Sequence, residues 1–129
     1  MQDFGEILIV DDSSTSRIII QRCVEMAGFS VGTVLFAENG LDAISLIKDN
    51  PRLELIITDI NMPKMDGQTL VQLVKSQPET AKIKLIVVSS IARGDAEDEL
   101  MALGVLAVIK KPVSPEKILK ALTGVRVED

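Results

Sequence analysis

Short runs rich in valine, isoleucine and leucine alternate along this chain with longer segments whose apolar residues have the period of a helix. Such alternation is typical of strand-helix units that build a parallel sheet. Most of the short runs are nearly continuous in apolar residues, which indicates strands that helices cover on both faces. The sequence therefore predicts an α/β fold made of five strand-helix repeats.

The boundaries of these elements follow from the apolar runs and the residues that flank them. The strands are expected at residues 6–10, 31–37, 53–58, 83–89 and 105–109, and the helices at 14–27, 41–48, 68–76, 93–103 and 115–122. Ser13 or Ser14 can cap the first helix, and Gly28 can end it. Core packing explains each apolar helix face, so none of these faces predicts a function by itself.

The size and charge of the chain limit what it can do. Its 129 residues are 47% hydrophobic, so we expect a single domain over residues 1–129 with a core at about 6–124. The net charge of −5 disfavours direct binding of nucleic acid by this chain. The sequence shows no secretory signal, no membrane span and only one cysteine, Cys23, which together predict a cytoplasmic protein without membrane insertion. It also contains no histidine, so any phosphohistidine chemistry needs an external donor.

Polar side chains follow four of the expected strands. Asp11 and Asp12 follow the first, Asp59 the third and Lys111 the fifth, while Ser89 ends the fourth. Because the carboxyl ends of parallel strands meet at one edge of the sheet, we expect these five side chains to converge. Each of them alone has an ordinary explanation as a helix-terminal acid, a turn residue, a strand hydroxyl or a solvated charge. Their joint occurrence points instead to a common site.

Such a site has a definite chemistry. Three carboxylates within about 4 Å repel one another by up to roughly 4 kcal/mol per pair at an effective dielectric of 20, so the cluster calls for a cation. With oxygen ligands only, Mg²⁺ is the expected ion. Asp59 is then a candidate nucleophile toward phosphorus, and Lys111 and Ser89 can contact two phosphoryl oxygens.

The residues at these positions resemble a known family. The motifs are Ile9-Val10-Asp11-Asp12, Asp59-Ile60-Asn61-Met62-Pro63 with Asp66-Gly67, Val88-Ser89-Ser90 and Lys110-Lys111-Pro112. Over roughly residues 6 to 124 they resemble, in the right order, the CheY-like receiver domain of response regulators in two-component signal transduction. The resemblance implies a flavodoxin-like (CheY-like) doubly wound sheet of strand order 2-1-3-4-5.

The resemblance also implies a role for each residue of the site. Asp59 matches the phosphoacceptor, Asp11 and Asp12 the acidic metal pair, the backbone carbonyl of Asn61 a further Mg²⁺ ligand, Ser89 the switch hydroxyl and Lys111 the phosphate-pairing lysine, whose bond to Pro112 is often cis in the family. The implied function is a phosphorelay switch whose donor is a sensor histidine kinase or a histidine phosphotransfer protein. Such a domain is a signalling switch that assists its own phosphorylation and dephosphorylation, and it acts on a downstream partner that the sequence leaves open.

Two positions depart from the family pattern. Val108 stands where the family usually has an aromatic residue in the fifth strand, and the chain has no tyrosine or tryptophan. Ile91 stands two residues after Ser89, where relatives tune water attack on the acyl phosphate. Because an apolar side chain cannot orient water, we expect a longer-lived phosphate in this chain than in its Ile91→Glu variant.

Three other functions fit parts of the pattern. A Mg²⁺-dependent phosphatase of the haloacid dehalogenase type also uses an aspartyl nucleophile, but it needs an acid where this chain has Asn61. A flavodoxin-type electron carrier would want backbone donors for a flavin phosphate where this chain has Asp11 and Asp12. A receiver-like scaffold without phosphorylation is the third, and the complete acidic set argues against it.

Overall fold

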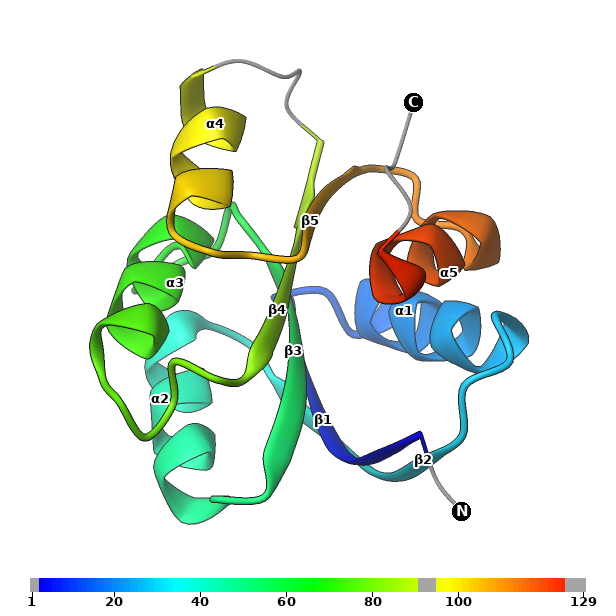
Figure 1. The fold of residues 1–129 in the computed structure, drawn as a ribbon, viewed down its shortest axis with the longest axis horizontal. Helices are drawn as coiled ribbons and strands as arrows, with labels where there is room; N and C mark the ends of the chain where they lie inside the picture. Colours follow the sequence, from blue (N-terminus) through cyan, green and yellow to red (C-terminus); the bar gives the residue numbers. More distant parts are fainter. Residues whose placement is uncertain (1–2, 91–94, 125–129) are drawn as a thin grey trace.

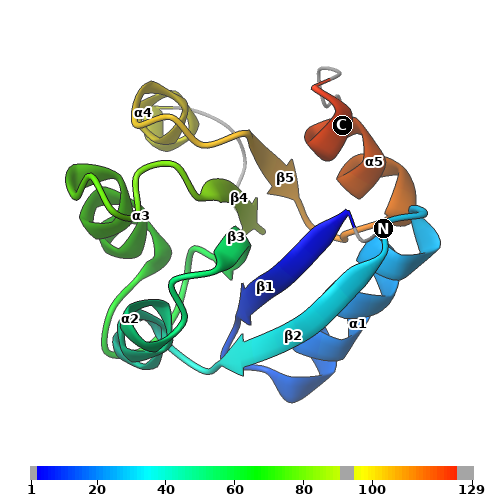
Figure 2. The same cartoon turned by 60° about the horizontal axis from the view of Figure 1, so that its bottom comes forward.

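The computed structural model of the chain describes residues 3–90 and 95–124. Its centre is a parallel sheet (Figures 1 and 2). The strands are β1 (Phe4–Val10), β2 (Val31–Ala37), β3 (Leu53–Asp59), β4 (Lys84–Ser89) and β5 (Ala107–Lys110). They pair in the order β2-β1-β3-β4-β5, which confirms the order expected for a flavodoxin-like fold.

Helices cover both faces of this sheet. They are α1 (Ser14–Met26), α2 (Gly40–Asp49), α3 (Gly67–Ser76), α4 (Asp95–Ala102) and α5 (Pro115–Thr123). Figure 1 shows α1 and α5 on one face, and α2, α3 and α4 on the other. None of the helices in the described parts of the chain is long and apolar enough to cross a membrane.

Short polar side chains begin most of the helices. Ser13 accepts a hydrogen bond from the backbone N–H of Ser16, so Ser13 and not Ser14 is the cap of α1. Asn39 and Asp66 cap α2 and α3 in the same way. At the other end of α1, Gly28 has a φ of 98°, which glycine adopts without steric cost. The sequence thus specifies where each of these helices starts or stops.

The core has two halves because alternate residues of a strand face opposite sides of the sheet. Ile7 and Ile9 pack toward α1 and α5, while Leu8 and Val10 pack toward α2 and α3. The expectation of strands buried on both faces holds for β1, β3 and β4. That expectation concerned most of the strands, and β2, at the sheet edge, is an exception that leaves Phe36 41% exposed.

Some element boundaries differ from those expected. β1 begins at Phe4, before residue 6, because Phe4 pairs with Val31 of β2. β5 begins two residues after the expected residue 105 because its pairing with β4 starts at Ala107. The expected start of the fourth helix, at residue 93, lies outside the described residues.

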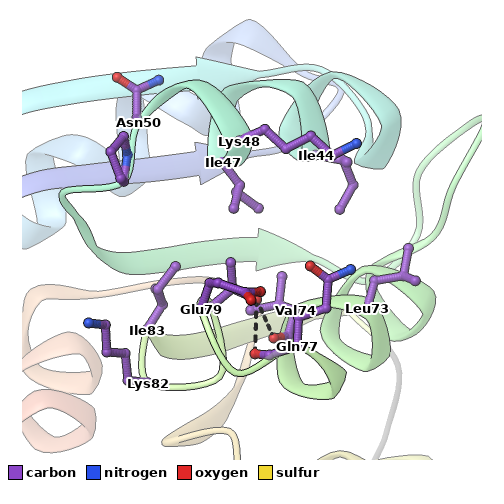
Figure 3. A pocket seen from close by; sticks show the side chains of 12 residues that line it. Ile44, Ile47, Lys48, Asn50, Leu73, Val74, Gln77, Glu79, Lys82 and Ile83 are labelled. Carbon is purple, nitrogen blue, oxygen red and sulfur yellow. Dashed lines mark hydrogen bonds between the residues drawn. The ribbon is translucent and has the colours of Figure 1, made fainter.

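A groove of about 780 Å³ separates α2 from α3 near the amino ends of β3 and β4 (Figure 3). Ile44 and Ile47 point from α2 toward α3, and Val74 lies opposite them. Lys48 and Lys82 belong to its lining and are exposed. The groove lies at the opposite end of the strands from the expected acidic site.

Candidate functional site

The carboxyl edge of the sheet carries the residues that the sequence placed there. Asp59 is the last residue of β3 and Ser89 the last of β4. Two backbone bonds continue the strand pairing past these ends: Ile60 N–H donates to Val88 O at 3.2 Å, and Lys111 N–H donates to Ser89 O at 2.8 Å. The loops that carry the functional side chains are therefore anchored to the sheet.

Three carboxylates meet at this edge. One side-chain oxygen from each of Asp11, Asp12 and Asp59 lies within 4.8 Å of the other two. Asp11 is 1% exposed and Asp59 6% exposed, whereas Asp12 is exposed. Residues 48 positions apart in the chain thus share one acidic pocket, with a single carboxylate facing solvent.

Lys111 supplies a cation to the cluster from the fifth strand-helix loop. Its Nζ lies 3.5 Å from Oδ2 of Asp59 and 3.7 Å from Oδ2 of Asp11. Ser89 is buried at the end of β4, the strand that pairs with β3. The five side chains come from four strand ends, and the edge brings Asp11, Asp59 and Lys111 into direct ionic contact.

The pKa of Asp11 reflects several opposing influences of its surroundings. Burial raises the pKa of its carboxyl group above the ordinary value of 3.8, and the charges of Asp59 and Asp12 act in the same direction. The backbone N–H of Ser13, which donates to Asp11 Oδ1 at 2.9 Å, and the ammonium of Lys111 lower this pKa.

The second carboxylate oxygen of Asp11, Oδ2, indicates whether the pocket suits a metal ion. Oδ2 is buried and accepts no hydrogen bond from residues 3–90 and 95–124, and its ionic contact with Lys111 Nζ, at 3.7 Å, is longer than a hydrogen bond. A buried carboxylate oxygen that accepts no hydrogen bond is costly, and the single ammonium of Lys111 faces three clustered carboxylates, so a further cation would lower the cost. Because the donor atoms are all oxygen, the pocket fits a hard divalent cation.

The loop after β3 brings its backbone very close to Asp59. Gly67 N–H donates to Ile60 O at 2.9 Å, and a Cβ at position 67 would lie 2.8 Å from Ile60 Cα and closer still to Asp59 O. Ile60 N–H donates to Asp59 Oδ1 at 2.8 Å. The glycine at the start of α3 therefore allows the approach that orients the Asp59 carboxylate.

The other positions singled out by the sequence have mixed outcomes. Asn61 is exposed in the loop after β3, and its carbonyl as a metal ligand stays a prediction. The peptide bond between Lys111 and Pro112 is cis. Val108 is half-buried and packs on the core beneath α2 and α3. Ile91 lies outside the described residues.

Sequence reasoning missed Arg17. Its Nη1 donates to the backbone carbonyl of Asp11 at 2.7 Å, and its guanidinium lies over the ring of Phe36, 5.9 Å from the centroid. The available signal was its spacing, because a residue six positions after Asp11 lies one turn into the helix that follows the strand. A long basic side chain there can reach back over the loop.

Known proteins match this arrangement. The family model for the response regulator receiver domain matches residues 7–123. Among curated proteins, the probable chemotaxis protein CheY of Rhizobium etli is 34% identical over 122 residues, covering 93% of this chain and 91% of that protein. The sensor histidine kinase CheAY of Helicobacter pylori is 35% identical over 111 residues, which are 85% of this chain and 13% of that protein.

Solved structures agree with the fold. CheY4 of Vibrio cholerae has a TM-score of 0.76 at 28% identity and covers 93% of this chain and 97% of its own. A chain of the CheX-CheY-BeF3-Mg²⁺ complex from Borrelia burgdorferi has a TM-score of 0.81 at 26% identity and covers 96% and 90%. These matches do not favour the phosphatase alternative. The chain belongs to the response regulator receiver domain family, the phosphorelay switches of two-component signalling.

Proposed function

We propose that Asp59 accepts a phosphoryl group from a phosphohistidine of a sensor histidine kinase or histidine phosphotransfer protein. The observation that carries this proposal is the nearly buried carboxylate of Asp59, 3.5 Å from the ammonium of Lys111 and beside two further acids. The phosphorylated domain then acts on a downstream protein in the cytoplasm. The Helicobacter relative is named a sensor histidine kinase, which supports the class of donor.

In the transfer step, a carboxylate oxygen of Asp59 attacks the phosphorus atom of the donor. A P–O bond forms as the P–N bond breaks, and the electron pair of that bond leaves with the imidazole. Lys111 can pair with a phosphoryl oxygen, and the hydroxyl of Ser89 can donate a hydrogen bond to another. The product is an acyl phosphate on Asp59.

Asp11, Asp12, Asp59 and the backbone carbonyl of Asn61 would hold Mg²⁺. When bound, this ion neutralises negative charge shared by the carboxylates and the incoming phosphoryl oxygens. The buried Oδ2 of Asp11, which accepts no hydrogen bond, supports the assignment, as does the Mg²⁺ in the Borrelia complex.

Phosphorylation would change the conformation through Ser89 and Lys111. Moving a population from mostly inactive to mostly active takes about 5.5 kcal/mol. Hydrogen bonds to a charged group contribute about 1.5 to 3 kcal/mol each, so about two to four new bonds to the phosphoryl group suffice. Since Val108 replaces the usual aromatic residue, we expect this switch to work without an aromatic rotamer. Ile91 favours slow loss of the phosphoryl group, and Ile91→Glu should shorten its lifetime.

The chemistry can be tested by mass. The protein is incubated with Mg²⁺ and acetyl phosphate, and its intact mass is measured. We expect a gain of one phosphoryl group that Asp59→Asn abolishes and that Asp49→Asn, at an exposed aspartate ending α2, leaves unchanged. Absence of any gain in the unsubstituted chain, or an equal gain in Asp59→Asn, would contradict the proposal.

A further inference from the structure

We propose that Arg17 is a positioning residue that holds the loop between β1 and α1 in the conformation in which Asp11 and Asp12 bind a divalent cation. The inference rests on the proposed function of the acidic pocket as a Mg²⁺ site. It assigns to Arg17 no contact with the ion or the phosphoryl group. Its action passes through the backbone of Asp11.

The hydrogen bonds of the loop show how Arg17 acts. Arg17 is fixed in the first turn of α1, where its own N–H donates to Ser13 O at 3.0 Å. From there Nη1 reaches back to Asp11 O at 2.7 Å, a short bond in which the donor is charged. Asp11 N–H donates to Ala37 O of β2 at 3.0 Å. Both peptide groups of the buried aspartate are therefore held, one by the sheet and one by Arg17.

Phe36 braces the guanidinium group. The ring centroid lies 5.9 Å from the central carbon of Arg17, within the range of a cation–π contact. Phe36 is 41% exposed on the edge strand, so core packing does not account for its ring. Bracing restricts the rotamers of a long side chain that would otherwise be free in water. An edge-strand phenylalanine beside the acidic pocket thus acquires a role.

The effect of Arg17 on the pocket is geometric more than electrostatic. The charges that act on the Asp11 carboxyl group are those of Asp59, Lys111 and Asp12. The guanidinium instead contacts the backbone carbonyl that precedes Asp12 in the chain. Without that contact the exposed Asp12 can turn away from Asp11 and Asp59, and the three ligand oxygens no longer lie together. Losing a partner that orients metal ligands typically lowers metal affinity by about 10- to 100-fold.

Mg²⁺ affinity measured by isothermal titration calorimetry tests the inference, since the chain has no tryptophan or tyrosine to report binding by fluorescence. We expect Arg17→Met to weaken Mg²⁺ binding by about tenfold. Arg17→Lys should recover part of the loss because an ammonium group can donate to the same carbonyl. The matched control is Arg22→Met, which removes the same charge from an exposed position of α1 and should leave the affinity unchanged.

The contact between the Phe36 ring and the Arg17 guanidinium can be tested separately. Phe36→Leu keeps an apolar residue but removes the ring face, so it should weaken Mg²⁺ binding by about two- to fivefold. In the Arg17→Met background the same substitution should have no effect, because the group that the ring supports is gone. Equal effects of Phe36→Leu in both backgrounds would contradict the bracing role.

Unfolding by urea, followed by circular dichroism, separates positioning from loss of structure. We expect Arg17→Met to lose Mg²⁺ affinity while its unfolding midpoint without metal stays close to that of Arg22→Met; if Arg17→Met does not fold, Arg17→Lys and Phe36→Leu carry the same comparison. Equal Mg²⁺ affinities in Arg17→Met and Arg22→Met would overturn the inference and leave the proposed function intact. Absence of Mg²⁺ binding in the unsubstituted chain would instead overturn the proposed function.

Discussion

The two ends of the sheet contrast sharply in what they bury. At the carboxyl ends of the strands, Asp11 and Asp59 are buried close together with Lys111 as their partner. At the amino ends, the groove between α2 and α3 is walled by aliphatic side chains such as Ile47 and Val74. The first arrangement concentrates charge in a region of low dielectric, and the second buries apolar surface.

The contrast shows that one end of the sheet contributes mainly to stability and the other mainly to function. Aliphatic contacts stabilise a fold roughly in proportion to the apolar area that they remove from water. Clustered carboxylates oppose folding until a cation joins them. Substitutions at the groove should therefore change stability and leave the chemistry intact. Substitutions of the charged side chains in the acidic pocket should change the chemistry and cost little stability or even add to it.

The largest effect on stability is expected from Ile47→Ala at the groove. Ile47 is 6% exposed and belongs to the core between the sheet and α2. Truncation leaves a cavity, so we expect the free energy of unfolding to fall by about 3 kcal/mol, measured by urea denaturation. Phosphoryl uptake per folded molecule should not change.

Leu73→Ala is the control on the facing helix. Leu73 lines the same groove but is 37% exposed, and its truncation should cost less than about 1 kcal/mol. A folded Ile47→Ala protein that no longer takes up a phosphoryl group would break the separation between the two ends.

A smaller loss is expected from Gly67→Ala, at the carboxyl end. The new Cβ would lie 2.8 Å from Ile60 Cα, and backbone atoms cannot yield as a flexible side chain does. We expect a loss of about 2 kcal/mol together with weaker Mg²⁺ binding, because the strand end that carries Asp59 must shift.

Gly28→Ala separates steric conflict from backbone strain. At Gly28 a Cβ would meet nothing within 4 Å, but φ is 98°, so the cost should be about 1 kcal/mol with no change in Mg²⁺ affinity. If both variants bind Mg²⁺ as the unsubstituted chain does, the close approach at Gly67 serves packing alone.

The acidic pocket could be predicted from the sequence because chain order and strand direction together define it. Once the apolar runs were assigned to parallel strands, Asp11 and Asp59 had to emerge on one edge. That inference needed no knowledge of side-chain packing. The errors of a few residues at the starts of β1 and β5 did not affect it.

What the sequence did not show depends on distances between elements. The exposure of β2 follows from its place at the edge, and the groove follows from how far apart α2 and α3 pack. The bond from Arg17 to the Asp11 carbonyl needs a particular rotamer as well as a helical position. The spacing of residues along the chain indicates the period of a helix or strand and the direction of each strand. It does not define how far apart two helices pack or which rotamer a side chain adopts.

A change of opposite sign is expected for Asp11→Asn without metal. The pKa of Asp11 is raised by burial, so its contribution to stability is present below pH 3.8 and is lost as pH rises through the higher pKa of the folded state. At pH 7 in EDTA, the asparagine variant should therefore have a higher free energy of unfolding than the unsubstituted chain. Saturating Mg²⁺ should reverse the order, because only the unsubstituted chain gains the full binding free energy. Urea denaturation of both proteins at pH 4 and pH 7, with and without Mg²⁺, measures the free energies of unfolding that this comparison needs. An Asp11→Asn protein less stable than the unsubstituted chain in EDTA at pH 7 would show that the pair with Lys111 outweighs burial and repulsion, and the carboxyl end would then stabilise the fold as the groove does.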